Sequence, residues 1–93
     1  MKMTINQNKI LPGVTARDYC ASVGKGLHEY VMEGVHTEHT GADVLEIFRK
    51  AVPDDAEVVV NYSSYSTAIN PHFCVDTAMG TALIPREKRS VRE

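Results

Sequence analysis

Three valines in a row, Val58-Val59-Val60, limit the folds open to this chain more than any other part of its sequence. β-branched side chains are stiff at χ1 and favour strands, and successive side chains of a strand point to opposite faces of a sheet. A strand that is apolar at every position therefore needs cover on both faces. Helices can cover one face, but a chain of 93 residues has little left to cover the other. This shortage predicts self-association, with a homodimer as the expected assembly.

The first expected helix begins near Thr15. Thr15 and Asp18 have the spacing of a capping box, with Asp in place of the preferred Glu or Gln. Apolar residues then recur at steps of three or four on one helix face: Tyr19, Val23, Leu27, Tyr30 and Val31. Gly34 is a suitable C-terminal stop, so the pattern predicts a helix over 15–33. Gly24 and Gly26 lie inside this helix, and a closely packed neighbouring backbone is the expected reason for them, with a kink of the helix as the alternative.

The second expected helix has the clearest signals in the chain. Residues 40–43, Thr-Gly-Ala-Asp, repeat the capping arrangement. A dense apolar stripe follows, made of Val44, Leu45, Ile47, Phe48, Ala51 and Val52. Arg49 and Lys50 fall in the last turn, where cations suit the helix dipole, and Pro53 ends the pattern. These signals predict a helix over 41–51.

The remaining residues are expected to form strands and turns. Residues 63–72 are mostly small and polar and contain Asn70-Pro71, which is typical of a long loop, or of a strand extension followed by a turn. Two short apolar runs, 73–76 and 81–84, predict a hairpin. The four residues between these runs end in a glycine, which suits the positive φ of a hairpin turn.

The order of these elements predicts a single α+β domain over residues 1–85. Two helices would pack on one face of a small antiparallel sheet of three strands. Met3-Thr4-Ile5 alternates weakly and is the candidate for a fourth strand at an N-terminal edge. Residues 86–93 carry four basic and two acidic side chains and would form a disordered or frayed basic tail.

The stretch from Asp43 to Val60 resembles a pattern in small proteins of phages and mobile elements. In that pattern a short helix ends in a proline–acidic turn, as at Val52-Pro53-Asp54-Asp55, and leads into a valine-rich strand. A hairpin with a Gly-Thr turn follows, as at Gly80-Thr81. The resemblance covers roughly residues 40–84. It implies the α+β fold and a phage or mobile-element setting, in which such proteins mostly lack an assigned activity.

Charge and composition argue against several classes of protein. Ten Lys and Arg residues against twelve Asp and Glu give a net charge of −2, which removes the usual electrostatic case for nucleic-acid binding. The uninterrupted apolar runs are too short to span a membrane, and polar residues follow Met1 where a secretory signal would be apolar. Cys20 and Cys74 form no disulfide framework, so we expect reduced thiols in a cytoplasmic protein.

Two pairs of side chains could bind a metal ion. His36 and His39 lie in the expected linker between the helices, and His72 and Cys74 lie at the start of an expected strand. Zinc takes about four nitrogen or sulfur ligands, and two close pairs on separate loops can supply them. Neither spacing matches the usual C-x2-C or H-x3-5-H pattern, which favours two solvated histidines and a core cysteine instead. We therefore expect no cofactor, with zinc as the alternative.

A protein-binding surface is the more attractive site. Tyr62 and Tyr65, with Ser64 between them, combine a large contact area with small polar neighbours that can adapt to a partner. Glu29 and Glu33 are four residues apart in the first expected helix, so they would share a face that could meet a basic partner.

These features predict a non-enzymatic interaction or regulatory protein, of phage or mobile-element type, that acts by protein–protein contact. A small zinc-binding protein that uses its His and Cys ligands is the alternative. An enzyme is the third hypothesis, and it would need a pocket formed between subunits, because a pocket of ordinary size is more than one short chain can enclose.

Overall fold

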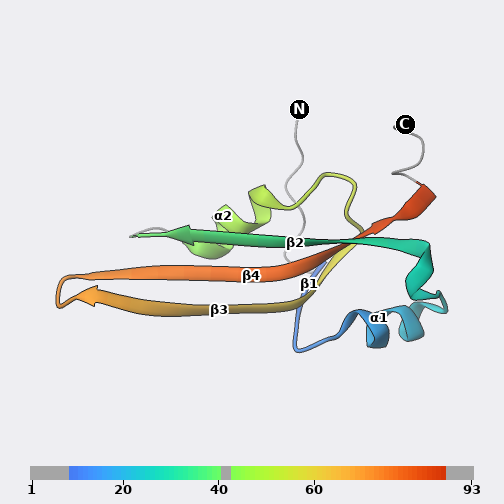
Figure 1. The fold of residues 1–93 in the computed structure, drawn as a ribbon, viewed down its shortest axis with the longest axis horizontal. Coiled ribbons are helices and arrows are strands. Elements are labelled where there is room, and N and C mark those ends of the chain that lie inside the picture. The colour runs from blue at the N-terminus through green and yellow to red at the C-terminus, as the bar shows by residue number, and fades with distance from the viewer. Residues whose placement is uncertain (1–8, 41–42, 88–93) are drawn as a thin grey trace.

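The structure is a computed structural model that describes residues 9–40 and 43–87. The described residues form a mixed four-stranded sheet in the order β1-β3-β4-β2, with two α-helices and a short 3-10 helix (Figure 1). The elements, in chain order, are β1 (Ile10–Pro12), α1 (Ala16–Val23), η2 (Leu27–Glu29), β2 (Tyr30–His39), α2 (Val44–Ala51), β3 (Val58–Asn70) and β4 (Phe73–Pro85).

The predicted α+β class is confirmed, and the four described strands are roughly compatible with the prediction of three and a possible fourth. The sheet is mixed and not antiparallel throughout, because β1 pairs in parallel with β3. The other two pairings, β3 with β4 and β2 with β4, are antiparallel. The N-terminal strand expected at Met3-Thr4-Ile5 and the tail beyond Glu87 lie outside the described residues.

Both faces of the valine run are buried, and one chain supplies both covers. Val58, Val59 and Val60 expose 2%, 0% and 0% of their surface. The α1 cluster consists of Cys20, Tyr30, Val58, Val60 and Leu83, with Leu11, Val14, Ala16, Tyr19 and Leu27 packed against it. The α2 cluster consists of Ile10, Val35, Phe48, Val52, Val59, Ala78 and Ala82, with Val44, Leu45, Ala56 and Tyr62 packed against it.

The two helices therefore lie on opposite faces of the sheet, and the prediction that both pack on one face is wrong. Alternate side chains of β3 point to opposite faces, so Val58 and Val60 meet α1 while Val59 meets α2. One helix on each side is enough to bury an unbroken apolar run. This removes the original ground for expecting a homodimer, because the second cover comes from within the chain.

Helix α1 begins where the sequence predicts but ends at Val23, so the prediction of a helix over 15–33 is wrong beyond that residue. Thr15 caps its start by accepting a hydrogen bond from the N–H of Asp18 at 3.0 Å. Gly24 ends it in the left-handed conformation, with φ 72°. Residues with a Cβ adopt this conformation at a cost, so Gly24 is the C-terminal cap. The expected close packing at Gly24 is also wrong, because an added Cβ would meet no described neighbour within 4 Å.

Strand β2 replaces the end of the expected helix and the expected linker. It pairs with β4 along its whole length, from Tyr30 opposite Pro85 to His39 opposite Asp76. Short apolar patterns satisfy helix and strand spacing equally well. Here the continuous antiparallel pairing with β4 decides between them, because it gives every second backbone group of β2 a partner.

Helix α2 confirms the second helix prediction from Val44 to Ala51, whereas the prediction is wrong at Asp43, which is the extended N-cap residue. Asp43 caps its start by accepting a hydrogen bond from the N–H of Leu45 at 3.1 Å, and the helix ends before Pro53. The first two residues of the predicted range, Gly41 and Ala42, lie outside the described residues.

The hairpin between β3 and β4 turns at Pro71-His72, so the turn predicted at 77–80 is wrong. Of the two predictions for 63–72, the strand extension followed by a turn is confirmed, since β3 continues to Asn70. Gly80 lies inside β4, where an added Cβ would come within 2.7 Å of the Val59 side chain and 3.2 Å of Phe48. This glycine therefore serves the close approach of α2 to the sheet.

A β-bulge interrupts β3 directly after Val60, where its pairing with β4 slips by one residue. Asn61 carries the slip with a φ of 54°, and it is the residue other than glycine that has a positive φ in the described chain. The slip sends Tyr62 to the α2 side, where its ring packs edge-on against Phe48 with centroids 5.0 Å apart. A one-residue slip exchanges the faces of all later residues, so this bulge decides which side chains of β3 stay uncovered.

We expect Val59→Ala and Val60→Ala each to destabilise the fold by about 2 kcal/mol, because each removes buried methyl groups from a different face. Urea unfolding of the two variants measures both costs. Thr67→Ala, an exposed change on the same strand, is the control and should change stability little. A cost at only one of the two valines would contradict cover on both faces.

At the bulge, Asn61→Gly should keep or raise stability by up to about 1 kcal/mol, because glycine adopts a positive φ without steric cost. Asn61→Val should lower stability by about 1–2 kcal/mol, since a β-branched residue is disfavoured there. Thermal unfolding of both variants tests this order. Equal melting temperatures for the two variants would show that no left-handed residue is needed at this position.

Candidate functional site

On the α1 side of the sheet, a helix covers only one end of the face. Helix α1 reaches only the end that carries Val58, Val60 and Leu83, and α2 lies on the opposite face. Met32 of β2 lies opposite Leu83 of the α1 cluster. Every second residue of β2 and β4, counted from this pair, therefore lies on the α1 side of the sheet. We call this surface the open face; it includes Met32, His36 and Glu38 of β2, Ser63, Tyr65 and Thr67 of β3, and Phe73, Val75 and Met79 of β4, with the buried Thr77 between Glu38 and Tyr65.

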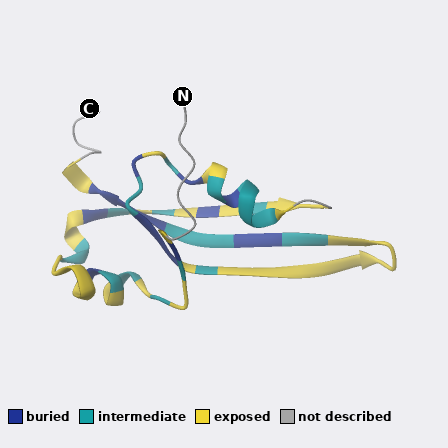
Figure 2. Cartoon of the chain, turned by 180° about the vertical axis from the view of Figure 1, so that it is seen from behind, coloured by how far each residue is buried: buried dark blue, intermediate teal, exposed yellow. Residues whose placement is uncertain are grey.

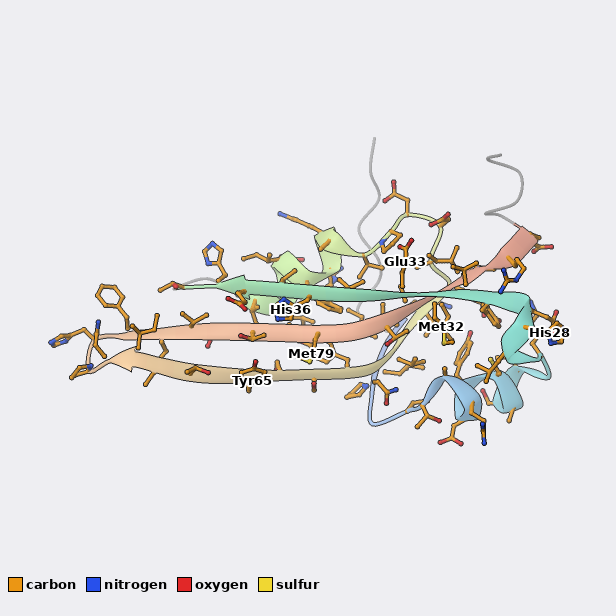
Figure 3. All side chains as sticks on the ribbon, viewed as in Figure 1. His28, Met32, Glu33, His36, Tyr65 and Met79 are labelled. Carbon is orange, nitrogen blue, oxygen red and sulfur yellow. The ribbon has the colours of Figure 1, made fainter. Side chains whose placement is uncertain are left out.

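The exposed apolar side chains of the open face are spread along its length, from Met32 near α1 to Phe73 at the start of β4, with polar residues between them. Met32, Tyr65 and Phe73 expose 54%, 52% and 55% of their surface. Met32, Met79 and Tyr65 lie across the three neighbouring strands β2, β4 and β3 (Figure 3). On β2, His36 Nε2 lies 3.6 Å from Glu38 Oε1. A row of exposed apolar groups with polar neighbours is typical of a surface that meets another molecule.

The outer edge of β3 is the second uncovered feature. Strand β1 pairs with β3 only as far as Tyr62. From Ser63 to Asn70 no described strand lies on that side, and every residue of the stretch is exposed (Figure 2). We call residues 63–70 the bare edge. Such an edge presents unpaired backbone N–H and C=O groups that can pair with another strand.

The structure separates the predicted tyrosine site. Tyr65 lies on the open face, as its pairing with Thr77 shows. Tyr62 is half-buried under α2, and Ser64 pairs with Ala78 of the α2 cluster, so both point to the other side of the sheet. Of the three residues, Tyr65 alone belongs to the open face.

The two predicted glutamates do not share a helix face, because the helix ends before them. Glu29 lies in η2, where its Oε2 accepts a hydrogen bond from the N–H of Gly26 at 2.9 Å. Glu33 lies in β2 opposite Ala82, on the α2 side of the sheet. The prediction that both glutamates lie on one face of the first helix is therefore wrong.

The four predicted zinc ligands are not brought together. His36 and His39 are three residues apart in an unbroken strand, so they point to opposite faces. His72 and Cys74 line a hollow of about 550 Å³ together with Thr40, Phe73 and Asp76. Within residues 9–40 and 43–87, no group of three or more His, Cys, Asp or Glu side chains is placed to hold a metal ion.

A cluster of three ionisable side chains joins α1 to the sheet. Glu57 Oε2 accepts hydrogen bonds from the hydroxyl groups of Tyr19 at 2.5 Å and Tyr30 at 2.8 Å. Burial and the bond to Glu57 raise the pKa of Tyr19 to about 12 and raise the pKa of Tyr30 further. Burial alone would raise the pKa of Glu57, but the two hydrogen bonds and the positive charge of Lys25 outweigh it and lower the pKa.

This cluster stabilises the fold rather than moving protons. At neutral pH the Glu57 carboxyl is ionised and both tyrosines are neutral, because each pKa is shifted away from 7. An efficient general acid or base has a pKa near the working pH. A hollow of about 300 Å³ lies next to the cluster and is lined by Lys25, His28, Glu29, Tyr30, Pro85, Arg86 and Glu87. Arg86 closes one side of it by donating hydrogen bonds to the carbonyls of His28 and Tyr30.

The sequence analysis missed Met32 and Met79 as surface residues. Met32 was assigned to a helix and Met79 to a turn, so the alternation that places both on one sheet face could not be recognised. The signal was Gly24, which could have been read as the end of the first helix. The residues after it then show strand spacing, because every second position falls on one face: Met32, Gly34, His36 and Glu38.

Comparisons of the chain with known protein families, with curated protein sequences and with solved structures give no match in any of the three. The resemblance to phage and mobile-element proteins over residues 40–84 thus stays a prediction, as does the hypothesis of an enzyme pocket between subunits. In the part of the chain that the structure describes, no helix has the length and apolar character needed to cross a membrane.

We expect Glu57→Gln to lower stability at pH 7 by about 1–2 kcal/mol, because an ionised acceptor of two hydrogen bonds is replaced by a neutral one. The lowered pKa of Glu57 stabilises the folded state at pH values above the ordinary glutamate range, and this contribution is lost as the pH falls through the folded-state pKa. The original protein should therefore lose stability more steeply than the variant below about pH 5.

Urea unfolding between neutral pH and mildly acidic pH measures both slopes. Asp54→Asn is the matched control, since Asp54 is an exposed carboxylate in the turn that precedes Glu57. Parallel slopes for the original protein and Glu57→Gln would mean that the Glu57 carboxylate is not held by Tyr19 and Tyr30.

Proposed function

We propose that this chain is a non-enzymatic interaction or regulatory protein that binds another protein through its open face. One observation carries the proposal. Among the described residues, five large hydrophobic side chains stay exposed, and three of them, Met32, Tyr65 and Phe73, lie on this one uncovered face. A protein that worked alone would gain stability by covering them, at roughly 25 cal/mol per Å² of apolar surface.

The residue types of the open face suit protein recognition. Methionine is flexible and polarisable, so Met32 and Met79 can adapt to partners of different shape. Tyrosine brings a large, rigid contact at a small entropic cost, and the neighbouring exposed Ser63 can supply a hydrogen bond. A partner of matching chemistry would present an apolar patch with a polar rim.

Three further predictions belong to this proposal. Cys20 is buried and Cys74 exposed, both as free thiols, and an exposed free thiol is compatible with the reducing cytoplasm. A phage or mobile-element setting rests on the sequence pattern of residues 40–84. We still propose a homodimer, but the support for it is now the bare edge of residues 63–70 and no longer the valine run.

Met32→Glu should weaken the capture of a protein partner by at least about tenfold, because a charge that replaces an exposed apolar side chain has to lose its water when the surface is covered on binding. The purified protein is immobilised, host extract is passed over it, and retained proteins are quantified by mass spectrometry. Val23→Glu is the matched control: Val23 is also an exposed apolar residue, at 42%, but it lies on α1 outside the open face.

The proposal is supported when the same proteins are retained by the original chain and by Val23→Glu and are lost from Met32→Glu. Retention of identical proteins by all three chains would place the binding surface elsewhere. Retention of no protein above background by any of them would contradict the interaction function itself.

A further inference from the structure

The bare edge has two defined ends and a regular middle. Strand β1 stops opposite Tyr62, and within residues 9–40 and 43–87 no other strand pairs with this side of β3. Slips in the pairing of β3 with β4 lie just before Ser63 and just after Ala68. Between them the pairing is regular, so outward N–H and C=O groups recur at every second residue. At about 3.4 Å per residue, this stretch can hold a strand of similar length.

The usual protections of a sheet edge are missing along this stretch. Natural edges carry charged side chains, prolines or bulges, or they are covered by a helix or loop. Strand β3 has no charged residue and no proline, and its bulges lie outside 63–68. Helix α2 packs on β2 and β4, away from the edge, and α1 packs at the far end of β3 near Val58. Among the described residues, no element therefore obstructs another strand that approaches from this side.

We propose that the bare edge binds the bare edge of a second copy of this chain. The two edges would pair antiparallel about a two-fold axis at Ser66, to give a continuous sheet in the order β2-β4-β3-β3-β4-β2. An axis perpendicular to the sheet keeps both open faces on the same side, so they join into one surface. This inference deepens the proposed function and rests on it, because the joined surface is the one assigned to the protein partner.

The residues of the edge are compatible with pairing to themselves. With Ser66 opposite Ser66 of the second copy, Tyr65 falls opposite Thr67 on the open face, which is a favourable pair of an aromatic and a β-branched side chain. On the other face Ser64 falls opposite Ala68, and both side chains are small. An interface between two copies has to be complementary to itself, and these uncharged pairs meet that condition.

The same register also fits the ends of the two edges. Tyr62, where β1 ends, falls opposite Asn70 of the second copy, so β1 does not block the pairing. An apolar hollow of about 160 Å³, lined by Ile10, Pro12, Leu45 and Tyr62, then lies beside the hairpin tip of the second copy. That tip carries Ile69, which exposes 64% of its surface in the single chain.

Charge does not oppose this arrangement. Ser66 Oγ donates a hydrogen bond to Asp76 Oδ1, so each copy places one carboxylate near the axis. The two Asp76 side chains would be separated by three strand spacings, roughly 14 Å at about 4.8 Å per spacing. This distance exceeds the Debye length of about 8 Å at physiological ionic strength, so their repulsion is largely screened.

Sedimentation equilibrium of the original chain and of Ser66→Lys tests the inference. The original chain should be dimeric at micromolar concentrations, and Ser66→Lys should weaken the dimer by at least about tenfold, because it places two ammonium groups opposite each other at the axis. Ser22→Lys is the matched control, since Ser22 is an exposed serine on α1, and it should remain dimeric. Circular dichroism verifies that each variant is folded.

Disulfide trapping tests the same contact without disrupting it. Ser66→Cys is made together with Cys74→Ser, which removes the exposed native thiol and leaves only the buried Cys20. Mild oxidation should link two chains through position 66. The control, Ser22→Cys with Cys74→Ser, should link far fewer chains.

A monomeric original chain, or a dimer that Ser66→Lys does not weaken, overturns the inference. A lack of preferential cross-linking at position 66 overturns it as well. These failures are distinct from failure of the proposed function. A monomer whose partner is still lost on Met32→Glu leaves the proposed function in place, whereas an edge-paired dimer that captures no partner contradicts the proposed function alone.

Discussion

Burial of the valine run from both sides is the constraint on which the rest of the structure depends. Because each face needs a helix and the described chain has two α-helices, each face is covered by one helix only. The eight residues of α1 span only about 12 Å, whereas the thirteen residues of β4 span about 44 Å. The long strands therefore extend well beyond the helix on the α1 side, and the side chains there, Met32 and Tyr65 among them, stay uncovered. The open face is thus a consequence of how the core is divided.

The bulge at Asn61 then decides which residues of β3 reach that face. Without it, strict alternation from Val60 would place Tyr62 on the α1 side and Tyr65 under α2. With it, Tyr62 packs against Phe48 in the core and Tyr65 becomes available to a partner. A single residue in a left-handed conformation therefore packs one tyrosine under α2 and leaves the other exposed on the open face.

The Glu57 cluster and the bare edge lie in different parts of the molecule. The carboxylate of Glu57 is held by Tyr19 and Tyr30 and fastens α1 to the sheet. The bare edge, in contrast, consists of uncharged residues whose backbone groups are the available binding partners. Recognition by backbone pairing and apolar contact depends little on pH or salt, while the attachment of α1 depends on the ionisation of Glu57.

Local signals in the sequence were sufficient for the α+β class, the start of α1 and the two-sided burial of the valine run, because capping residues and χ1 stiffness act through neighbours in the chain. They were not sufficient for the end of α1, the assignment of His36 and His39 to a strand, or the position of the hairpin turn. Those features depend on pairing with β4, a strand that lies more than forty residues further along the sequence from the start of β2. The side of the sheet that each helix covers, and hence the open face, was decided by tertiary packing alone, because a strand buried on both faces accepts a helix on either.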